Sequence, residues 1–129
     1  MTTRGLAAVK GGNFELYSWF FMRVSALVLI FLVVFHLLYM HIAIRVENIT
    51  FQTIVDRWSG PLGWFWSLYD VSMLFLALLH GANGMRWVID DYVRRPAWNT
   101  SIKVALYLVV FIMLIMGTQT IIRFQTGAM

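Results

Sequence analysis

The sequence predicts an all-α protein of three membrane-spanning helices, and two observations support this fold class. The 129 residues are 60% hydrophobic and only 12% charged, whereas soluble domains average about 25% charged residues. Three continuous apolar runs also reach the roughly 20 residues that a helix needs to cross about 30 Å of hydrocarbon. A chain of this length cannot bury so much apolar surface in its own core, so its solvent is lipid.

The three spans are expected at residues 18–44, 62–89 and 101–122 of a single domain, residues 1–129. Strands are not expected, because an open sheet leaves unpaired backbone groups in lipid. Residues 1–15 are polar and are expected to form an uncleaved, partly ordered tail. The apolar run that follows them is too long for a signal peptide.

Two connecting segments complete the predicted architecture. In the segment 45–60, Phe51, Ile54, Val55 and Trp58 recur at helical spacing, which favours a short helix lying in the membrane interface. Between the second and third spans, the sequence Arg94-Arg95-Pro96 predicts a tight turn, because proline disfavours helical geometry in the residue before it.

The basic residues predict the orientation of the chain, whose formal net charge is +4. A cytoplasmic N-terminus leaves seven basic residues on the cytoplasmic side and three on the other, in agreement with the positive-inside rule. The seven are Arg4, Lys10, Arg23, Arg86, Arg94, Arg95 and Lys103; the three are Arg45, Arg57 and Arg123. This division between the two ends argues against a nucleic-acid partner. The absence of cysteine excludes disulfides and iron–sulfur clusters on this chain.

His80 is the polar residue of the second span that most strongly indicates function. It lies about eleven residues from the charged end, or roughly 16 Å along a helix, and therefore near the bilayer midplane. A buried imidazole needs a partner in hydrocarbon. Gly84 follows one turn later on the same helix face, where a missing side chain accommodates a flat macrocycle. The spacing indicates an axial ligand to haem iron; the alternative is a histidine hydrogen-bonded to a neighbouring helix.

Further polar residues lie near this depth. Arg23 is either a snorkelling arginine or a partner for a haem propionate, which guanidinium binds through two hydrogen bonds. Arg86, six residues after His80, is a second candidate for a propionate. Ser25 offers its hydroxyl either to the same region or to its own helix backbone.

The far half of the first two spans offers a weaker candidate site. His36 lies deep enough to ligate a second haem, although polar packing is the favoured interpretation. His41 is close to the membrane interface. Asp70 is expected to meet water or a tyrosine such as Tyr69.

Asp91 and Tyr92 end the second span at the predicted cytoplasmic interface. Tyr92 fits the aromatic belt of membrane proteins, and its hydroxyl can also donate a hydrogen bond to a quinone carbonyl. Asp91, close in sequence to Arg94 and Arg95, is a candidate to orient the quinone site or relay protons.

Taken together, these residues resemble the small D-type membrane-anchor subunit of succinate dehydrogenase, the succinate:quinone oxidoreductase of respiratory complex II. The family pattern is a histidine, a glycine four residues later, and an Asp-Tyr pair eleven and twelve residues later. Here these are His80, Gly84, Asp91 and Tyr92. Arg23-Val24-Ser25 matches the first-helix pattern more loosely. The resemblance covers nearly the whole chain.

The resemblance implies a three-helix membrane anchor in the inner (cytoplasmic) membrane, part of electron transport and the tricarboxylic acid cycle. It implies that His80 is one axial ligand of haem b, that Arg23 lies near the propionates and that Tyr92 binds the quinone. The other axial ligand belongs to a second membrane-anchor subunit. Succinate is oxidised on a flavoprotein subunit, and an iron–sulfur subunit passes the electrons to the quinone, so the anchor itself is non-catalytic.

Three alternatives remain at this stage. The chain is a fumarate reductase anchor, which shares the architecture. It is a non-redox membrane protein, such as a small transporter or assembly subunit, in which His80 is a structural contact. Or it is a dihaem cytochrome b with both ligands in one chain, for which His36 is the only candidate partner at matching depth.

Overall fold

The computed structural model describes residues 13–126, which are helical apart from short turns. The elements are α1 (Asn13–Leu38), a π-helical turn at Tyr39–Arg45, a 3-10 turn at Val46–Asn48, α2 (Phe51–Ser59), α3 (Gly63–Tyr92) and α4 (Pro96–Thr126). Of the expected tail, residues 1–12 lie outside the described residues. Residues 13–15 were expected in that tail but form the first turn of α1.

Three helical segments are long and apolar enough to cross a membrane: Asn13–Asn48, Gly63–Tyr92 and Pro96–Phe124. This confirms the all-α fold with three spans. The first and third segments extend beyond both boundaries expected from hydropathy. The second begins at Gly63, one residue after the expected start, and extends beyond the expected end. The reason is that helical hydrogen bonding continues through polar residues such as Asn13 and Glu15 after the apolar run has ended.

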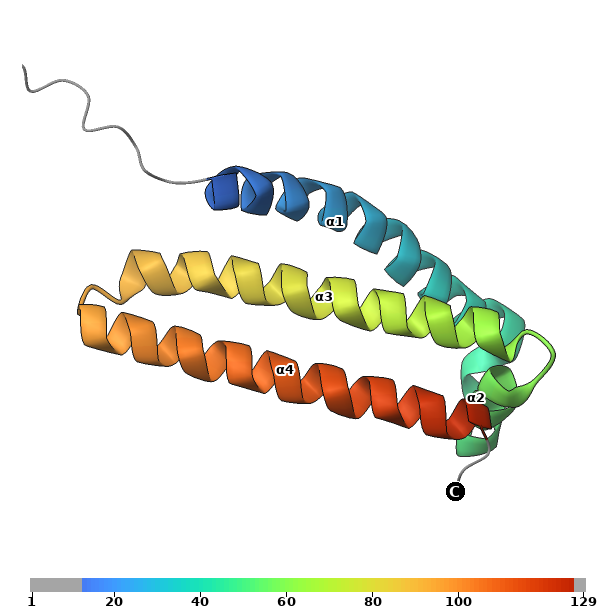
Figure 1. Cartoon of the computed structure of the whole chain (residues 1–129). Coiled ribbons are helices and arrows are strands. Elements are labelled where there is room, and N and C mark those ends of the chain that lie inside the picture. Colours follow the sequence, from blue (N-terminus) through green and yellow to red (C-terminus); the bar gives the residue numbers. More distant parts are fainter. Residues whose placement is uncertain (1–12, 127–129) are drawn as a thin grey trace, which may run out of the picture.

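Helix α3 lies between α1 and α4 (Figure 1). Helices α3 and α4 run side by side and are joined by the short turn at residues 93–95, where the sequence predicts a break before Pro96. We call this the turn end of the bundle. Helix α2 packs against α3 and α4 at the opposite end, which we call the α2 end.

The interior of the bundle is unusually polar, and its exterior is apolar. Among the described residues, the buried hydrophobic side chains are Met40, Ala82, Ile89, Val110 and Ile121. The buried polar side chains are Ser18, Ser25, Ser67, Asp70 and Arg86. Large apolar residues instead face outward; Phe31, for example, is 76% exposed. This distribution suits a chain whose outer surface contacts lipid or other membrane helices.

Helix α2 forms in the segment where apolar spacing predicts a short helix. Thr50 and Thr53 form a capping box: the Thr50 hydroxyl accepts from the Thr53 amide at 3.3 Å, and the Thr53 hydroxyl accepts from the Thr50 amide at 2.9 Å. The turn into α3 requires Gly63, because a Cβ there would lie 2.0 Å from the Trp58 carbonyl oxygen. This turn at Gly63 places α2 against α3 and α4.

Candidate functional site

His80 lies on α3 and meets a buried hydroxyl of α1. Its Nδ1 atom is 2.8 Å from Ser25 Oγ. Ser25 is only 2% exposed, and its hydroxyl also donates to the Phe21 carbonyl oxygen at 2.6 Å. Ser25 therefore contacts both its own backbone and His80. Within the described residues, the other ring nitrogen of His80, Nε2, has no hydrogen-bond partner.

Gly81 and Gly84 follow His80 on α3, and the packing of this chain does not require glycine at either position. A Cβ at Gly84 would meet only the flexible end of Met22, at 3.6 Å, which is an ordinary contact. A Cβ at Gly81 would meet nothing within 4 Å. Glycine costs about 1 kcal/mol relative to alanine in a helix interior. Helix packing inside the chain does not explain that cost at either position.

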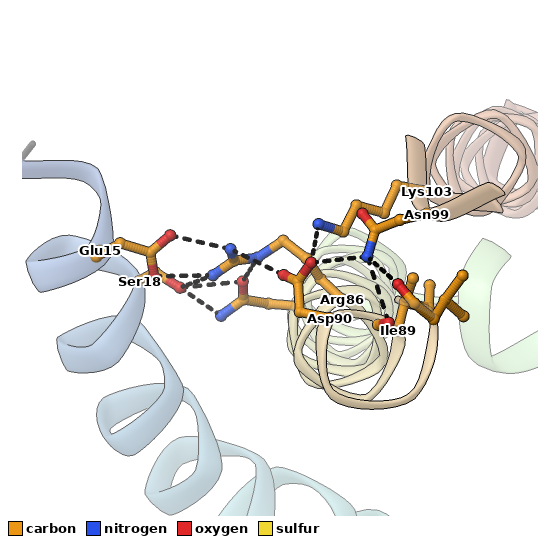
Figure 2. Close-up of polar contacts among 9 residues, drawn as sticks. Glu15, Ser18, Arg86, Ile89, Asp90, Asn99 and Lys103 are labelled. Atoms are coloured by element: carbon orange, nitrogen blue, oxygen red, sulfur yellow. Dashed lines mark hydrogen bonds and ion pairs between the residues drawn. The ribbon is translucent and has the colours of Figure 1, made fainter. Parts of the chain in front are cut away.

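Arg86 connects α1 to α3 at the turn end (Figure 2). Its two terminal nitrogens donate to the two carboxylate oxygens of Glu15 at 3.0 and 3.2 Å. It also donates to Ser18 Oγ at 3.2 Å and to Asn83 Oδ1 at 3.1 Å. Ser18 and Asn83 hydrogen-bond each other as well. A buried guanidinium is thus fully occupied by groups of this chain, rather than left free for a ligand.

Further contacts join α3 to α4 at the same end, and they meet the first set where Arg86 Nη1 lies 4.0 Å from Asp90 Oδ2 (Figure 2). Lys103 forms an ion pair with Asp90, and Asn99 donates to Asp90 Oδ1 at 3.0 Å. The Asn99 amide also lies 3.4 Å from the Ile89 carbonyl and 3.2 Å from the Val93 carbonyl. These contacts hold the last turn of α3 against α4.

Asp91 and Tyr92 follow immediately and take no part in these contacts. Tyr92 is 83% exposed, and Asp91 is exposed too. In the described part of the chain, no ion pair joins Asp91 to Arg94 or Arg95. The adjacent carboxylates therefore differ: Asp90 links helices, whereas Asp91 and the Tyr92 hydroxyl remain available to a ligand or a partner subunit.

Arg23 lies on the exposed surface of α1. Its guanidinium carbon is 3.7 Å from the centroid of the Trp19 ring, a cation–π contact. No carboxylate of the described residues pairs with it. Of the two arginines that the sequence suggested for a propionate, Arg23 is the one that forms no ion pair with any described residue.

The α2 end holds a second buried polar cluster. Asp70 accepts from the Arg57 guanidinium and, at 2.8 Å, from Trp58 Nε1. His36 Nε2 lies 3.3 Å from Arg57 Nη1 and 3.8 Å from Asp70 Oδ1. Tyr69, expected as a partner of Asp70, donates instead to the Leu32 carbonyl oxygen. His36 is therefore engaged in polar packing, as favoured from the sequence.

A cavity of about 660 Å³ lies beside this cluster, lined mainly by apolar side chains of all four helices. Arg57 Nε and Asp70 Oδ1 are buried there and lack a hydrogen-bond partner in the described part of the chain. His80 does not line this cavity, so the two polar regions of the bundle are separate.

Two of these partnerships were missed from the sequence. Glu15 was assigned to the tail and Arg57 to the interfacial segment, so neither was matched to Arg86 or Asp70. A usable signal existed for Asp70, because a carboxylate inside a membrane span needs a cation. Arg57 is the nearest basic residue in sequence, on the helix that precedes the span.

Comparison with protein families identifies a relationship that covers most of the chain. Residues 6–117 match the protein family described as “Succinate dehydrogenase/Fumarate reductase transmembrane subunit”. The matched range includes His80 and its partner Ser25, the glycine at position 84, and the Asp91-Tyr92 pair. No curated protein matches the chain.

Proposed function

Because the chain belongs to the family of succinate dehydrogenase/fumarate reductase transmembrane subunits, we propose that it is the membrane-anchor subunit of a succinate:quinone oxidoreductase. The family makes it part of an oxidoreductase complex, and its three apolar helices make it a multi-pass membrane protein. In this proposal the chain contributes to a b-type haem site and to a quinone site. Succinate is oxidised on a partner flavoprotein.

The observation that carries the haem assignment is that Nε2 of His80 has no hydrogen-bond partner in residues 13–126. Histidines that ligate metals usually use their second ring nitrogen to hydrogen-bond a fixed group, which sets the orientation of the ring. The 2.8 Å contact between Nδ1 and Ser25 Oγ supplies such a group. Gly84 leaves the helix face one turn away without a side chain. His80 would ligate the iron of a haem and Gly84 would leave room for its ring, and the bound haem would carry single electrons.

Arg23 and Arg86 have different parts in this proposal. Arg23 contacts the Trp19 ring but pairs with no carboxylate of the described residues, so its guanidinium can bind a propionate. Arg86 would have to exchange Glu15 for a propionate, because both of its terminal nitrogens already donate to that carboxylate. Arg23 is therefore our first choice for the propionate partner.

Tyr92 and Asp91 are proposed to face the quinone. Tyr92 ends α3 with its side chain exposed, so its hydroxyl is free to donate to a quinone carbonyl. Asp91 is free to orient that site or to exchange protons with it. Asp90, Asn99 and Lys103 hold the preceding turn in place.

A second anchor subunit is proposed because His80 supplies only one axial ligand. The chain's other histidines are engaged elsewhere: His36 contacts Arg57, and His41 Nδ1 lies 2.9 Å from the Leu37 carbonyl oxygen of its own helix. The partner's ligand would complete the iron coordination. With a cytoplasmic N-terminus in the inner membrane, the turn end that carries Tyr92 would face the flavoprotein and iron–sulfur subunits.

Purification of the complex through a tag on this chain tests the proposal. We expect a second anchor, an iron–sulfur subunit and a flavoprotein subunit to co-purify, with a b-type reduced-minus-oxidised spectrum. Succinate should reduce quinone faster than quinol reduces fumarate; the opposite ratio would make the complex a fumarate reductase. A chain that purifies alone with bound haem would contradict the need for a second anchor.

A further inference from the structure

Ser25 is the most deeply buried residue that touches His80. Its relative exposure is 2%, and its Oγ atom lies within hydrogen-bond distance of two groups, the Phe21 carbonyl oxygen and His80 Nδ1. A third oxygen, the Met22 carbonyl, is more distant at 3.4 Å. A hydroxyl has one proton to donate, so the partners decide where that proton lies.

The Phe21 carbonyl determines the direction of both hydrogen bonds. A carbonyl oxygen only accepts, and two oxygens 2.6 Å apart with no proton between them would repel each other. The Ser25 proton therefore points to Phe21. Ser25 Oγ is then the acceptor toward His80, and His80 Nδ1 must carry a proton. In this tautomer Nε2 has a lone pair and no proton, which is the form that binds a metal.

We infer that Ser25 is a positioning residue that holds His80 in its Nδ1–H tautomer and strengthens Nε2 as an electron donor. The inference rests on the proposed haem role of His80. A hydrogen bond from Nδ1–H to an acceptor raises the basicity of a histidine ligand. A more basic ligand favours ferric over ferrous iron, so Ser25 lowers the midpoint potential of the haem.

The test compares three variants in the purified complex by redox titration and by haem content per flavin. Ser25→Ala removes the acceptor, and we expect the haem to remain bound with a raised midpoint potential. Each tenfold loss of the preference for ferric iron corresponds to a rise of about 59 mV. Ser25→Thr keeps the hydroxyl and should restore the wild-type potential. Ser67→Ala is the matched control, because Ser67 is a buried serine whose hydroxyl has no partner among the described residues.

The outcomes separate this inference from the haem assignment. An unchanged potential in Ser25→Ala with normal haem content overturns the role of Ser25 and leaves His80 as a ligand. Haem loss in Ser25→Ala that Ser25→Thr repairs supports a role for the hydroxyl. Loss of haem in both Ser25→Ala and Ser25→Thr would assign Ser25 a packing role and overturn the inference. Full haem content in His80→Ala would instead refute the proposed haem role of His80, on which this inference rests.

Discussion

The guanidinium of Arg57 on α2 and the carboxylate of Asp70 on α3 form an ion pair whose side chains are only 6% and 7% exposed. The pair connects the short helix to a membrane span, and His36 and Trp58 also contact it. Removing one member of a buried pair leaves an uncompensated charge, which typically costs about 3–5 kcal/mol.

Arg57→Ala or Asp70→Ala is therefore expected to lower the thermal stability of the complex in detergent strongly, by an amount of that order. The double variant Arg57→Leu/Asp70→Leu should recover most of the loss, because no buried charge remains. Asp56→Ala serves as the control, since Asp56 is exposed on the same helix. Single variants as stable as this control would show that the ion pair does not hold α2 in place.

Arg23→Gln is expected to lower the midpoint potential of the haem without destabilising the complex. A cation near the propionates favours the reduced iron, and Arg23 makes no ion pair within the described chain whose loss would cost stability. Arg86→Gln should instead destabilise the complex and leave the midpoint potential unchanged, because it breaks the contacts to Glu15 and Ser18. Redox titration and thermal melting of both variants check this. A potential shift confined to Arg86→Gln would transfer the propionate role to Arg86.

Asp91→Asn and Asp90→Asn are expected to separate quinone chemistry from helix packing. Asp90 pairs with Lys103, but its side chain is exposed, so water screens the pair and its loss should cost little stability and leave activity intact. Asp91→Asn should lower quinone reduction and leave the melting temperature unchanged. Equal activity in the two variants would remove Asp91 from the quinone site.

Tyr92→Phe is expected to reduce quinone use by a few-fold to roughly tenfold. It removes one hydrogen bond, worth about 0.5–1.5 kcal/mol net, and keeps the ring. Succinate oxidation with an artificial acceptor that takes electrons before the membrane should be unaffected. Tyr17→Phe, another exposed tyrosine, is the control. Equal loss of both activities in Tyr92→Phe would mean that Tyr92 supports assembly, and no loss would make it only an interface anchor.

The three spans and the turn before Pro96 were predictable, because both depend on local properties of the chain. Long apolar runs cross lipid as helices, and proline disfavours helical geometry in the residue before it. The short helix α2 was visible for the same reason in the spacing of Phe51, Ile54 and Trp58. The start of α1 at Asn13 was not predictable, because hydropathy detects the edge of the hydrocarbon rather than the end of the helix.

The partners of the polar residues were much harder to predict. His80 and Gly84 stood out from their own spacing on one helix. That His80 meets Ser25, that Arg86 meets Glu15 and that Asp70 meets Arg57 depends on how the helices face one another. Periodicity does not determine this facing, since apolar residues surround each of these spans on nearly all sides.

The haem content of the purified complex carrying His80→Ala tests the central claim most directly. The helices should still insert, because insertion depends on the apolar runs. We predict that haem per flavin falls to a small fraction of the wild-type value, while His41→Ala, which alters a histidine bonded to its own backbone, keeps full haem. Wild-type haem content in His80→Ala would contradict the assignment of His80 as an axial ligand.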